Sequence, residues 1–194
     1  AGVATRYLYA PEYLAERSSA LPFPFHLIIG DKFGGSMDEA AFITWVNLRN
    51  IFSDLGRVFN IDFESYTLEL GGEERISIEE ASKDLEYILK YLSHKGLTRN
   101  SETKSEYKII KCNKKDYKSY FAKQAGLYDF IAKPGQLIKK GDLLAIGINF
   151  ENYFLEESIK YEVLANEDCI VLTHYPSSSV MQGTEIYQVM EQFY

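Results

Sequence analysis

The first half of the chain alternates short apolar runs with longer amphipathic stretches. The run Phe25–Gly30 is mostly apolar and ends at a glycine, which is typical of a buried strand in a mostly parallel sheet. Ser36 before Met37–Leu55 and Ser77 before the next amphipathic stretch, which Gly96 closes, are each followed three residues later by a glutamate, which predicts two capped helices. Ser65–Leu70 alternates polar and apolar positions and predicts another strand. The order strand, helix, strand, helix indicates an α/β layer.

Each predicted helix carries an apolar stripe at helical spacing, which is the face that a helix normally turns toward a core. The part of the chain before Phe25 contains prolines and shows no clear periodicity, so we expect irregular segments there. The stripes consist of Ala41, Trp45, Leu48, Phe52 and Leu55 in the first helix, and of Ala81, Leu85, Ile88, Leu89 and Leu92 in the second.

The second half of the chain has a different pattern, with short strand-like runs in place of long amphipathic stretches. Residues 98–106 are polar and form the best candidate linker, so we expect an α/β domain over 1–98 and a β domain over 99–194. Short strand-like runs separated by Pro, Gly and Asn or Asp turns indicate that the second domain is all-β. These runs are Tyr107–Cys112, Tyr117–Ala122, Leu127–Ala132, Leu143–Ile148, Ile159–Leu164, Cys169–His174 and Glu185–Met190.

The β half contains a weak internal repeat. Leu127–Asp142 and Ile170–Thr184 share one plan, in which a strand, a proline turn, an apolar pair and a glycine precede another strand. Two such halves are too few for a solenoid. They predict a flattened sandwich or barrel, similar to the biotinyl/lipoyl hybrid type.

Composition and charge narrow the function classes. The chain has 194 residues, a net charge of -7 and a pI near 5.1, and an acidic surface disfavours nucleic-acid binding. No apolar run is long enough for a membrane span and no signal peptide is visible, so a cytoplasmic protein is expected. Cys112 and Cys169 are interpreted as small buried hydrophobes rather than as a disulfide. The chain starts at Ala1 without an initiator Met, so a processed or truncated polypeptide is expected.

Glu69 is the strongest candidate for chemistry. It ends the predicted strand Ser65–Leu70 just before two glycines, and its leucine neighbours should point to the opposite face of the strand. A carboxylate at a strand end, beside a glycine turn, is a typical position for a general base. The alternative is a carboxylate that faces solvent or caps the next helix. Other glutamates, Glu73, Glu74, Glu79 and Glu80, are available for that capping role.

The histidines provide no metal motif. None of the three, His26, His94 and His174, opens an H-x-x-E sequence or has a histidine partner four residues away. His26 lies in an apolar run and is interpreted as a core histidine, whereas His94 suits the negative end of a helix. No metal ligand is therefore assigned in this chain.

Several motifs together resemble the succinylglutamate desuccinylase/aspartoacylase family of zinc carboxypeptidase-like hydrolases. The resemblance extends over most of the chain, although Asn166 and Asp168 stand where the family often has Ala-Pro and then Gly. It implies a zinc-peptidase-like partial sheet with flanking helices, followed by a barrel-sandwich-like β domain. The motifs are Thr67-Leu68-Glu69-Leu70-Gly71, Leu89-x-x-Leu92-Ser93-His94-Lys95-Gly96-Leu97, Ala125-Gly126-Leu127, Gly135–Ile146 and Val163-Leu164-Ala165.

The resemblance also implies roles for individual residues. Glu69 would be the general base, and Arg6 would bind a substrate carboxylate, unless it is an ordinary surface arginine. Tyr66 and Tyr161 would contact substrate, although Tyr66 alternates onto the face opposite Glu69. The family's zinc ligands fall upstream of the region matched by Ala1–Tyr9, so the chain is expected to be a C-terminal portion that lacks them.

The leading hypothesis is a zinc-dependent deacylase or amidohydrolase acting on an N-acyl amino acid or a similar small amide, with homo-oligomerisation left open. A second hypothesis is a biotinyl/lipoyl-type carrier or binding module. It is weaker because the segment Asn149–Ser158, which joins the two half-repeats, has no lysine to modify. A third hypothesis is an inactive fragment or relative with a structural role.

Overall fold

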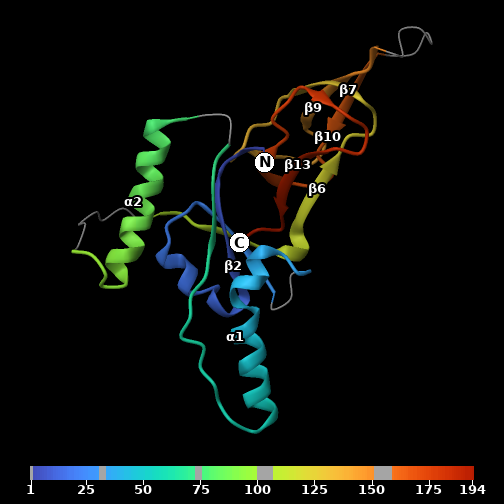
Figure 1. The fold of residues 1–194 in the computed structure, drawn as a ribbon. Helices are drawn as coiled ribbons and strands as arrows, with labels where there is room; N and C mark the ends of the chain where they lie inside the picture. Colours follow the sequence, from blue (N-terminus) through green and yellow to red (C-terminus); the bar gives the residue numbers. More distant parts are fainter. Residues whose placement is uncertain (1, 31–33, 73–75, 100–106, 151–158) are drawn as a thin grey trace. The chain divides into compact units, whose positions relative to one another are not determined.

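The computed structural model describes residues 2–30, 34–72, 76–99, 107–150 and 159–194 (Figure 1). Most of the predicted linker 98–106 and of the segment Asn149–Ser158 lies outside these residues. The chain forms two compact units, and we call residues 7–68 and 79–114 the α/β unit and residues 1–6, 69–78 and 115–194 the β unit. This division differs from a boundary at residues 98 and 99. Residues 99–114 join the α/β unit, and two short segments from the first half join the β unit.

A four-stranded sheet forms the centre of the α/β unit. Its order is β4-β2-β3-β5, and β2 (Arg6–Pro11), β3 (Phe25–Ile29) and β5 (Ile110–Asn113) run parallel. All five residues of β3 are buried, as a strand inside a parallel sheet should be. The predicted strand at Phe25–Gly30 is therefore confirmed, and the alternating run predicted at Ser65–Leu70 corresponds to β4 (Thr67–Leu70).

The expectation of irregular structure before Phe25 is wrong for β2. This strand is buried at four of its six positions and lies between β4 and β3, although its last residue is Pro11. Proline at the last position of a strand interrupts little of the ladder. The 3-10 helices η1 (Glu12–Leu14) and η2 (Arg17–Ala20) then lead the chain toward β3.

Both predicted helices are present, as α1 (Met37–Asp54) and α2 (Ile78–His94). The Ser36 Oγ accepts a hydrogen bond from the Glu39 backbone N–H at 3.2 Å, as the capping pattern predicts. Glycines with positive φ follow both helices, at 67° for Gly56 and 72° for Gly96, and allow the chain to turn back onto the last carbonyls.

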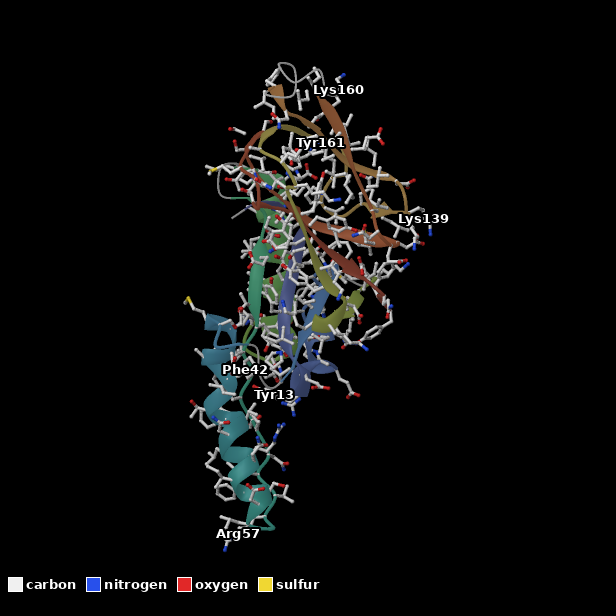
Figure 2. All side chains as sticks on the ribbon, turned by 90° about the vertical axis from the view of Figure 1, so that its right-hand side faces the viewer. Tyr13, Phe42, Arg57, Lys139, Lys160 and Tyr161 are labelled. Atoms are coloured by element: carbon white, nitrogen blue, oxygen red, sulfur yellow. The ribbon has the colours of Figure 1, made fainter. Side chains whose placement is uncertain are left out.

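The apolar stripes predicted to face the core are largely exposed, which corrects the sequence-based expectation. In α1 the buried residues are Phe42 and Val46, and Figure 2 shows Phe42 beside Tyr13, whose ring it meets edge to face. In α2 the side chains of Tyr87 and Tyr91 pack against a core of Leu8, Ala10, Leu21, Phe23 and Ile28. The helices carry apolar or amphipathic residues on more than one side, so periodicity alone does not identify the packed face.

Two sheets build the β unit. The five-stranded sheet has the order β1-β11-β13-β6, with β8 also pairing β11, and the other sheet has the order β10-β9-β7-β12. No closed barrel is formed by the strands that the structure describes. The strands are β1 (Val3–Ala4), β6 (Tyr117–Phe121), β7 (Gly126–Phe130), β8 (Leu137–Ile138), β9 (Leu143–Ile148), β10 (Lys160–Leu164), β11 (Cys169–His174), β12 (Ser179–Val180) and β13 (Glu185–Glu191), and the 3-10 helix η3 (Lys114–Asp116) precedes β6.

The predicted internal repeat appears in the pairing of these strands. The series β6-β13-β11-β8 in one sheet has the same plan as β10-β9-β7-β12 in the other, so each half of the repeat contributes strands to both sheets. The turns match as well. Gly141 N–H donates to the Ala165 carbonyl and Gly183 N–H donates to the Ala122 carbonyl, both at 2.8 Å. The repeat therefore reflects an approximate twofold relation within the β unit.

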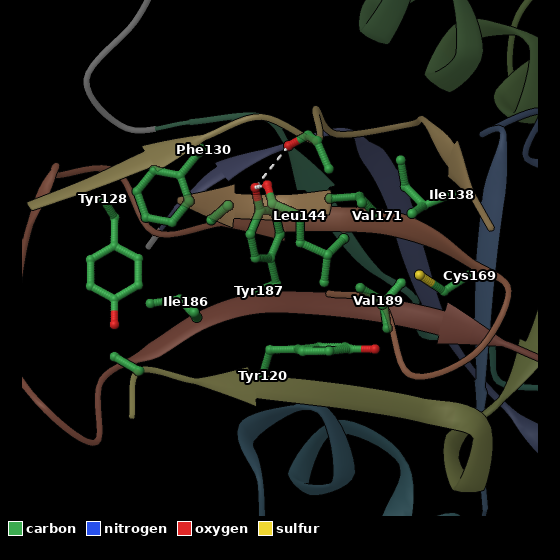
Figure 3. Packing of buried hydrophobic residues seen from close by; sticks show 14 of the residues in the cluster. Tyr120, Tyr128, Phe130, Ile138, Leu144, Cys169, Val171, Ile186, Tyr187 and Val189 are labelled. Atoms are coloured by element: carbon green, nitrogen blue, oxygen red, sulfur yellow. Dashed lines mark hydrogen bonds between the residues drawn. The ribbon is translucent and has the colours of Figure 1, made fainter. Parts of the chain in front are cut away.

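One hydrophobic core lies between these strands, and Figure 3 shows its packing. Both sheets contribute to it, for example Tyr128 and Phe130 from β7 and Tyr187 from β13. The buried Tyr187 hydroxyl lies 2.6 Å from the Leu144 carbonyl and 3.1 Å from the Ala132 carbonyl, so it ties β13 to the opposite sheet. Cys169 is buried here and Cys112 is buried in the α/β unit, each as a free thiol, as expected.

His26 is a core residue of the α/β unit, as the sequence indicates. Its Nε2 lies 3.1 Å from the Leu21 carbonyl and its Nδ1 lies 3.0 Å from the Ser18 hydroxyl. Burial and then the charge of Lys111 lower the pKa of His26 from 6.5 to about 4, so the ring is neutral near pH 7.

None of the helices in the described part of the chain combines the length and the apolarity that crossing a membrane requires.

We predict that Tyr187→Phe lowers the free energy of unfolding of the β unit by about 1–2 kcal/mol, because the variant removes a buried hydroxyl that bridges two carbonyls. Urea denaturation followed by far-ultraviolet circular dichroism measures this loss. Tyr194→Phe is the matched control, since Tyr194 is 66% exposed. Equal stability of the two variants would contradict the bridging role.

We also predict that acid destabilises the α/β unit through His26. The unfolded chain takes up the proton near pH 6.5 and the folded chain only near pH 4, so stability is full above pH 6.5 and falls as the pH drops toward 4. The loss between pH 7 and pH 5 is about 2 kcal/mol. Denaturation curves at the two pH values should show a smaller difference in His26→Gln, and an unchanged difference would refute this assignment.

Candidate functional site

Glu69 lies on β4, an edge strand of the four-stranded sheet, and its side chain is half-buried. Tyr66 and Leu68 pack against the core of the α/β unit. Because side chains alternate along a strand, Glu69 points away from that core, together with Thr67. The carboxylate thus stands on the face of the strand opposite the core of the α/β unit.

Arg6 lies directly beside the turn that follows Glu69. Gly71 has a φ of 101°, a conformation that favours glycine. A Cβ on Gly71 would lie 3.2 Å from Nη1 and 3.3 Å from Cζ of Arg6, so the guanidinium rests against the glycine backbone. A Cβ on Gly72 would lie 3.2 Å from the Gly2 carbonyl oxygen. Two glycines therefore admit the amino-terminal segment, and with it Arg6, to the end of the strand that carries Glu69.

Tyr66 is held within the α/β unit. Its hydroxyl donates to Glu64 Oε2 at 3.2 Å, and its ring meets Tyr91 of α2 edge to face with 5.9 Å between ring centroids. Burial, followed by the negative charge of Glu64, raises the pKa of Tyr66 far above its ordinary value of 10. The hydroxyl therefore stays protonated and serves as a hydrogen-bond donor. Tyr66 directly precedes β4 and packs against the core, so strand alternation puts it on the side opposite Glu69.

Glu64 is a polar centre that the sequence interpretation does not identify. Its carboxylate accepts hydrogen bonds from the Tyr91 hydroxyl at 2.7 Å and from the Lys95 ammonium, and Arg17 Nη1 lies 3.6 Å away. Burial favours the neutral acid, but the bonds from Lys95 and Tyr91 outweigh it and hold the pKa of Glu64 below 4.5. Glu64 lies in an irregular segment with no sequence motif, so only the fold reveals this cluster.

Tyr161 lies on β10 of the β unit (Figure 2). Its ring covers Gly147 of the neighbouring strand β9, where a Cβ would lie only 2.1 Å from the Tyr161 Cζ. Its hydroxyl bonds the Tyr128 hydroxyl and lies 3.2 Å from the Gln124 carbonyl. Burial and then the hydrogen bond to Tyr128 raise the pKa of Tyr161 well above 10. Tyr161 and Tyr128 thus form one half-buried hydroxyl pair.

The described residues do not make a zinc site. No group of three or more His, Cys, Asp or Glu side chains with metal-binding geometry occurs among them. Both ring nitrogens of His26 form hydrogen bonds, with the Ser18 hydroxyl and the Leu21 carbonyl. The ring of His174 stacks on Phe130 with 4.8 Å between ring centroids. His94 is exposed in the last turn of α2. These histidines lie in separate environments and do not fit a tetrahedral ligand set.

Solved structures with the same fold include proteins described as succinylglutamate desuccinylases/aspartoacylases. A succinylglutamate desuccinylase/aspartoacylase-type protein from Shewanella frigidimarina is 34% identical with a TM-score of 0.90, and the match covers 100% of this chain and 52% of that one. A family protein from Shewanella amazonensis is also 34% identical, with a TM-score of 0.89 and coverage of 100% and 53%. A desuccinylase/aspartoacylase from Rhodobacter sphaeroides, at 19% identity and a TM-score of 0.70 over 98% and 54% of the two chains, supports the fold alone.

No protein-family model matches the chain, and no curated protein matches it either. The chain spans about half the length of the solved relatives, and the matching half is their C-terminal portion. Identity of 34% over the whole chain, together with the position of the Thr67–Gly71 motif at a strand end, establishes the relationship. The chain therefore belongs to the succinylglutamate desuccinylase/aspartoacylase family.

Proposed function

We propose that this protein is a deacylase that hydrolyses the amide bond of an N-acyl amino acid or a similar small amide, with Glu69 as its general base. The observation that carries the proposal is the position of Glu69 at the end of β4, next to the glycine turn that receives Arg6. A carboxylate at the end of a strand and a guanidinium against the turn that follows it suit a substrate that has both a scissile amide and a free carboxylate. Membership of the deacylase family supports the same reaction class.

Glu69 and Arg6 have complementary tasks in this proposal. The Glu69 carboxylate accepts a proton from the attacking water and then delivers it to the nitrogen of the leaving amine. The Arg6 guanidinium binds the substrate carboxylate through paired hydrogen bonds and so fixes the amide relative to Glu69. Tyr66 and Tyr161 remain proposed substrate contacts. Both hydroxyls form hydrogen bonds within the protein, so each would have to exchange such a bond for one to substrate.

Zinc dependence is part of the proposal. The described residues do not fit a zinc site, so its ligands would have to lie outside them. When bound, a divalent ion of this kind lowers the pKa of water and polarises a carbonyl. The contribution of this chain is the proton transfer by Glu69 and the carboxylate binding by Arg6.

One observation favours a second function, that of a carrier module. The twofold plan of the β unit, with strands exchanged between two sheets, supports the proposal that this unit has the barrel-sandwich architecture of biotinyl/lipoyl domains. Carriers of that type need a lysine between the two halves, and Asn149–Ser158 contains none. Lys160 pairs with Ile148 inside the β10–β9 ladder. We therefore favour the deacylase over a carrier, and an inactive structural relative stays the remaining alternative.

We predict that Glu69→Gln in the full-length polypeptide lowers kcat for N-acetyl and N-succinyl amino acids by about 10²- to 10⁴-fold, because the amide cannot accept the proton. Steady-state kinetics and metal analysis of the same preparation measure the effect, and the metal content should be unchanged. Glu162→Gln is the matched control, because Glu162 is an exposed strand glutamate on β10. Undiminished kcat in Glu69→Gln would exclude Glu69 as the general base.

We predict that Gly71→Ala raises KM about tenfold and leaves kcat nearly unchanged, because the new methyl group displaces the Arg6 guanidinium from its place. Gly141→Ala is the control. Gly141 has a comparable φ of 85°, but a Cβ there meets no atom within 4 Å. Both variants should lose stability from backbone strain, and only Gly71→Ala should change KM. An equal effect of both on KM would contradict the role of Arg6.

A further inference from the structure

Strand β10 is the end strand of one sheet of the β unit. In the order β10-β9-β7-β12 it pairs with β9, and none of the other described strands pairs with its outer edge. The Ile159 carbonyl accepts a hydrogen bond from the Asn149 N–H, so Ile159 and every second residue after it turn their backbone groups toward β9. The N–H and C=O groups of Lys160 and Glu162 therefore face the outer edge. Such an edge is a template for a further strand.

The side chains along this edge form a pattern that is complementary to itself. In the order Ile159, Lys160, Tyr161, Glu162, Val163 they are apolar, positive, aromatic, negative and apolar. Lys160 and Glu162 are exposed and lie on the same face of the strand. Two copies of the strand that run antiparallel about Tyr161 place each Lys160 opposite the Glu162 of the other copy. Each Ile159 then lies opposite a Val163.

The charges also select this register. Lys160 and Glu162 both turn their backbone groups to the edge, so the two residues can form a hydrogen-bonded pair across an antiparallel ladder. The neighbouring registers with the same backbone pattern would place Lys160 opposite Lys160, or Glu162 opposite Glu162. Like charges directly opposite each other are destabilising. A lysine on an edge strand usually opposes pairing, but here it opposes every alignment except one.

The local structure of β10 is compatible with this pairing. The Tyr161 ring lies over Gly147 of β9, where a Cβ would clash with it, so the ring is directed toward β9 and away from the outer edge. The pairing of β10 with β9 is regular up to Val163, and the register shifts between Val163 and Leu164. An irregularity of this kind bends a strand and ends its regular edge. The regular edge therefore coincides with the self-complementary segment.

We propose that β10 pairs with β10 of a second copy of this chain and joins their two four-stranded sheets into one continuous sheet. Charge complementarity identifies this occupant, because a second copy supplies the matching order of charges in reverse. The net charge of -7 opposes association, but that repulsion is screened beyond about 8 Å at physiological ionic strength, whereas cross-strand pairs act at contact. Because the paired edge is short, the dimer dissociates on dilution.

Charge reversal in the full-length polypeptide tests this proposal, with sedimentation velocity at several protein concentrations as the measurement. Glu162→Lys places lysines opposite each other twice, so we expect the dissociation constant of the dimer to rise about tenfold. This variant also makes the chain less negative by two charges, so general repulsion predicts the opposite change. The matched control is the double variant Lys160→Glu/Glu162→Lys, which keeps the net charge, restores both pairs and should associate as the unaltered protein does.

Disulfide cross-linking reads the register directly. Lys160→Cys chains mixed with Glu162→Cys chains should form a disulfide between the two variants in oxidised glutathione, because opposite residues of a hydrogen-bonded pair have Cα atoms about 5.5 Å apart. Either variant alone should cross-link poorly, since identical positions lie diagonally, about 7–8 Å apart. The native Cys112 and Cys169 are buried, so they contribute little background.

Three outcomes would overturn the proposal. The first is an unaltered polypeptide that stays monomeric at every concentration, and the second is a dimer that Glu162→Lys does not weaken. The third is weakened association that the double variant does not restore. If circular dichroism shows that a charge-reversal variant is misfolded, the cross-linking pattern decides instead. Because the readout is association rather than turnover, it is independent of the deacylase proposal.

Discussion

The close approach of the amino-terminal segment to the turn after β4 is the constraint on which the candidate site depends. At Gly71 and Gly72 an added Cβ would lie 3.2 Å from Arg6 Nη1 and from the Gly2 carbonyl oxygen respectively, so any side chain there would crowd the amino-terminal segment. Gly71 in addition adopts a positive φ that L-residues rarely accept. The pair of glycines therefore does more than end a strand. It also leaves room for the segment that carries Arg6 next to the strand that carries Glu69.

Features encoded within a few neighbouring residues are easier to predict from the sequence than the approach of the amino-terminal segment to the turn after β4. The helix starts at Ser36 and Ser77 and the glycines after both helices are encoded within a few residues, and the structure places the helices accordingly. Glu69 at a strand end beside a glycine turn is local in the same sense. The contact of Arg6 with Gly71 joins segments that are far apart in the sequence, so no pattern around either residue reveals it. The sequence does not indicate strand β2 for a related reason, since its place between β4 and β3 comes from pairing in the sheet.

The helix faces illustrate a second limit of sequence patterns. In α2 the leucines at helical spacing suggest a core-facing stripe, but the helix packs through Tyr87 and Tyr91 instead. A tyrosine can cover a core with its ring and bond a polar partner with its hydroxyl, as Tyr91 does with Glu64. A leucine stripe has no such bond to fix it. The hydrogen bonds from Tyr91 and Lys95 to Glu64 therefore support this rotation of the helix, together with the packing of Tyr87 and Tyr91.

The architecture of the β unit does not by itself indicate a carrier function. Its two halves exchange strands so that each sheet takes members of both, and this arrangement needs only matched turns at Gly141 and Gly183 and a shared core around Tyr187. None of these features requires a modified lysine, and the chain has none in the segment between the halves. Strands of both halves pair in both sheets and share one core, so the repeat serves the packing of the β unit. In the proposed function, the chemistry would depend on the few residues placed around the glycine turn, and a fold-level likeness gives no information about individual side chains there.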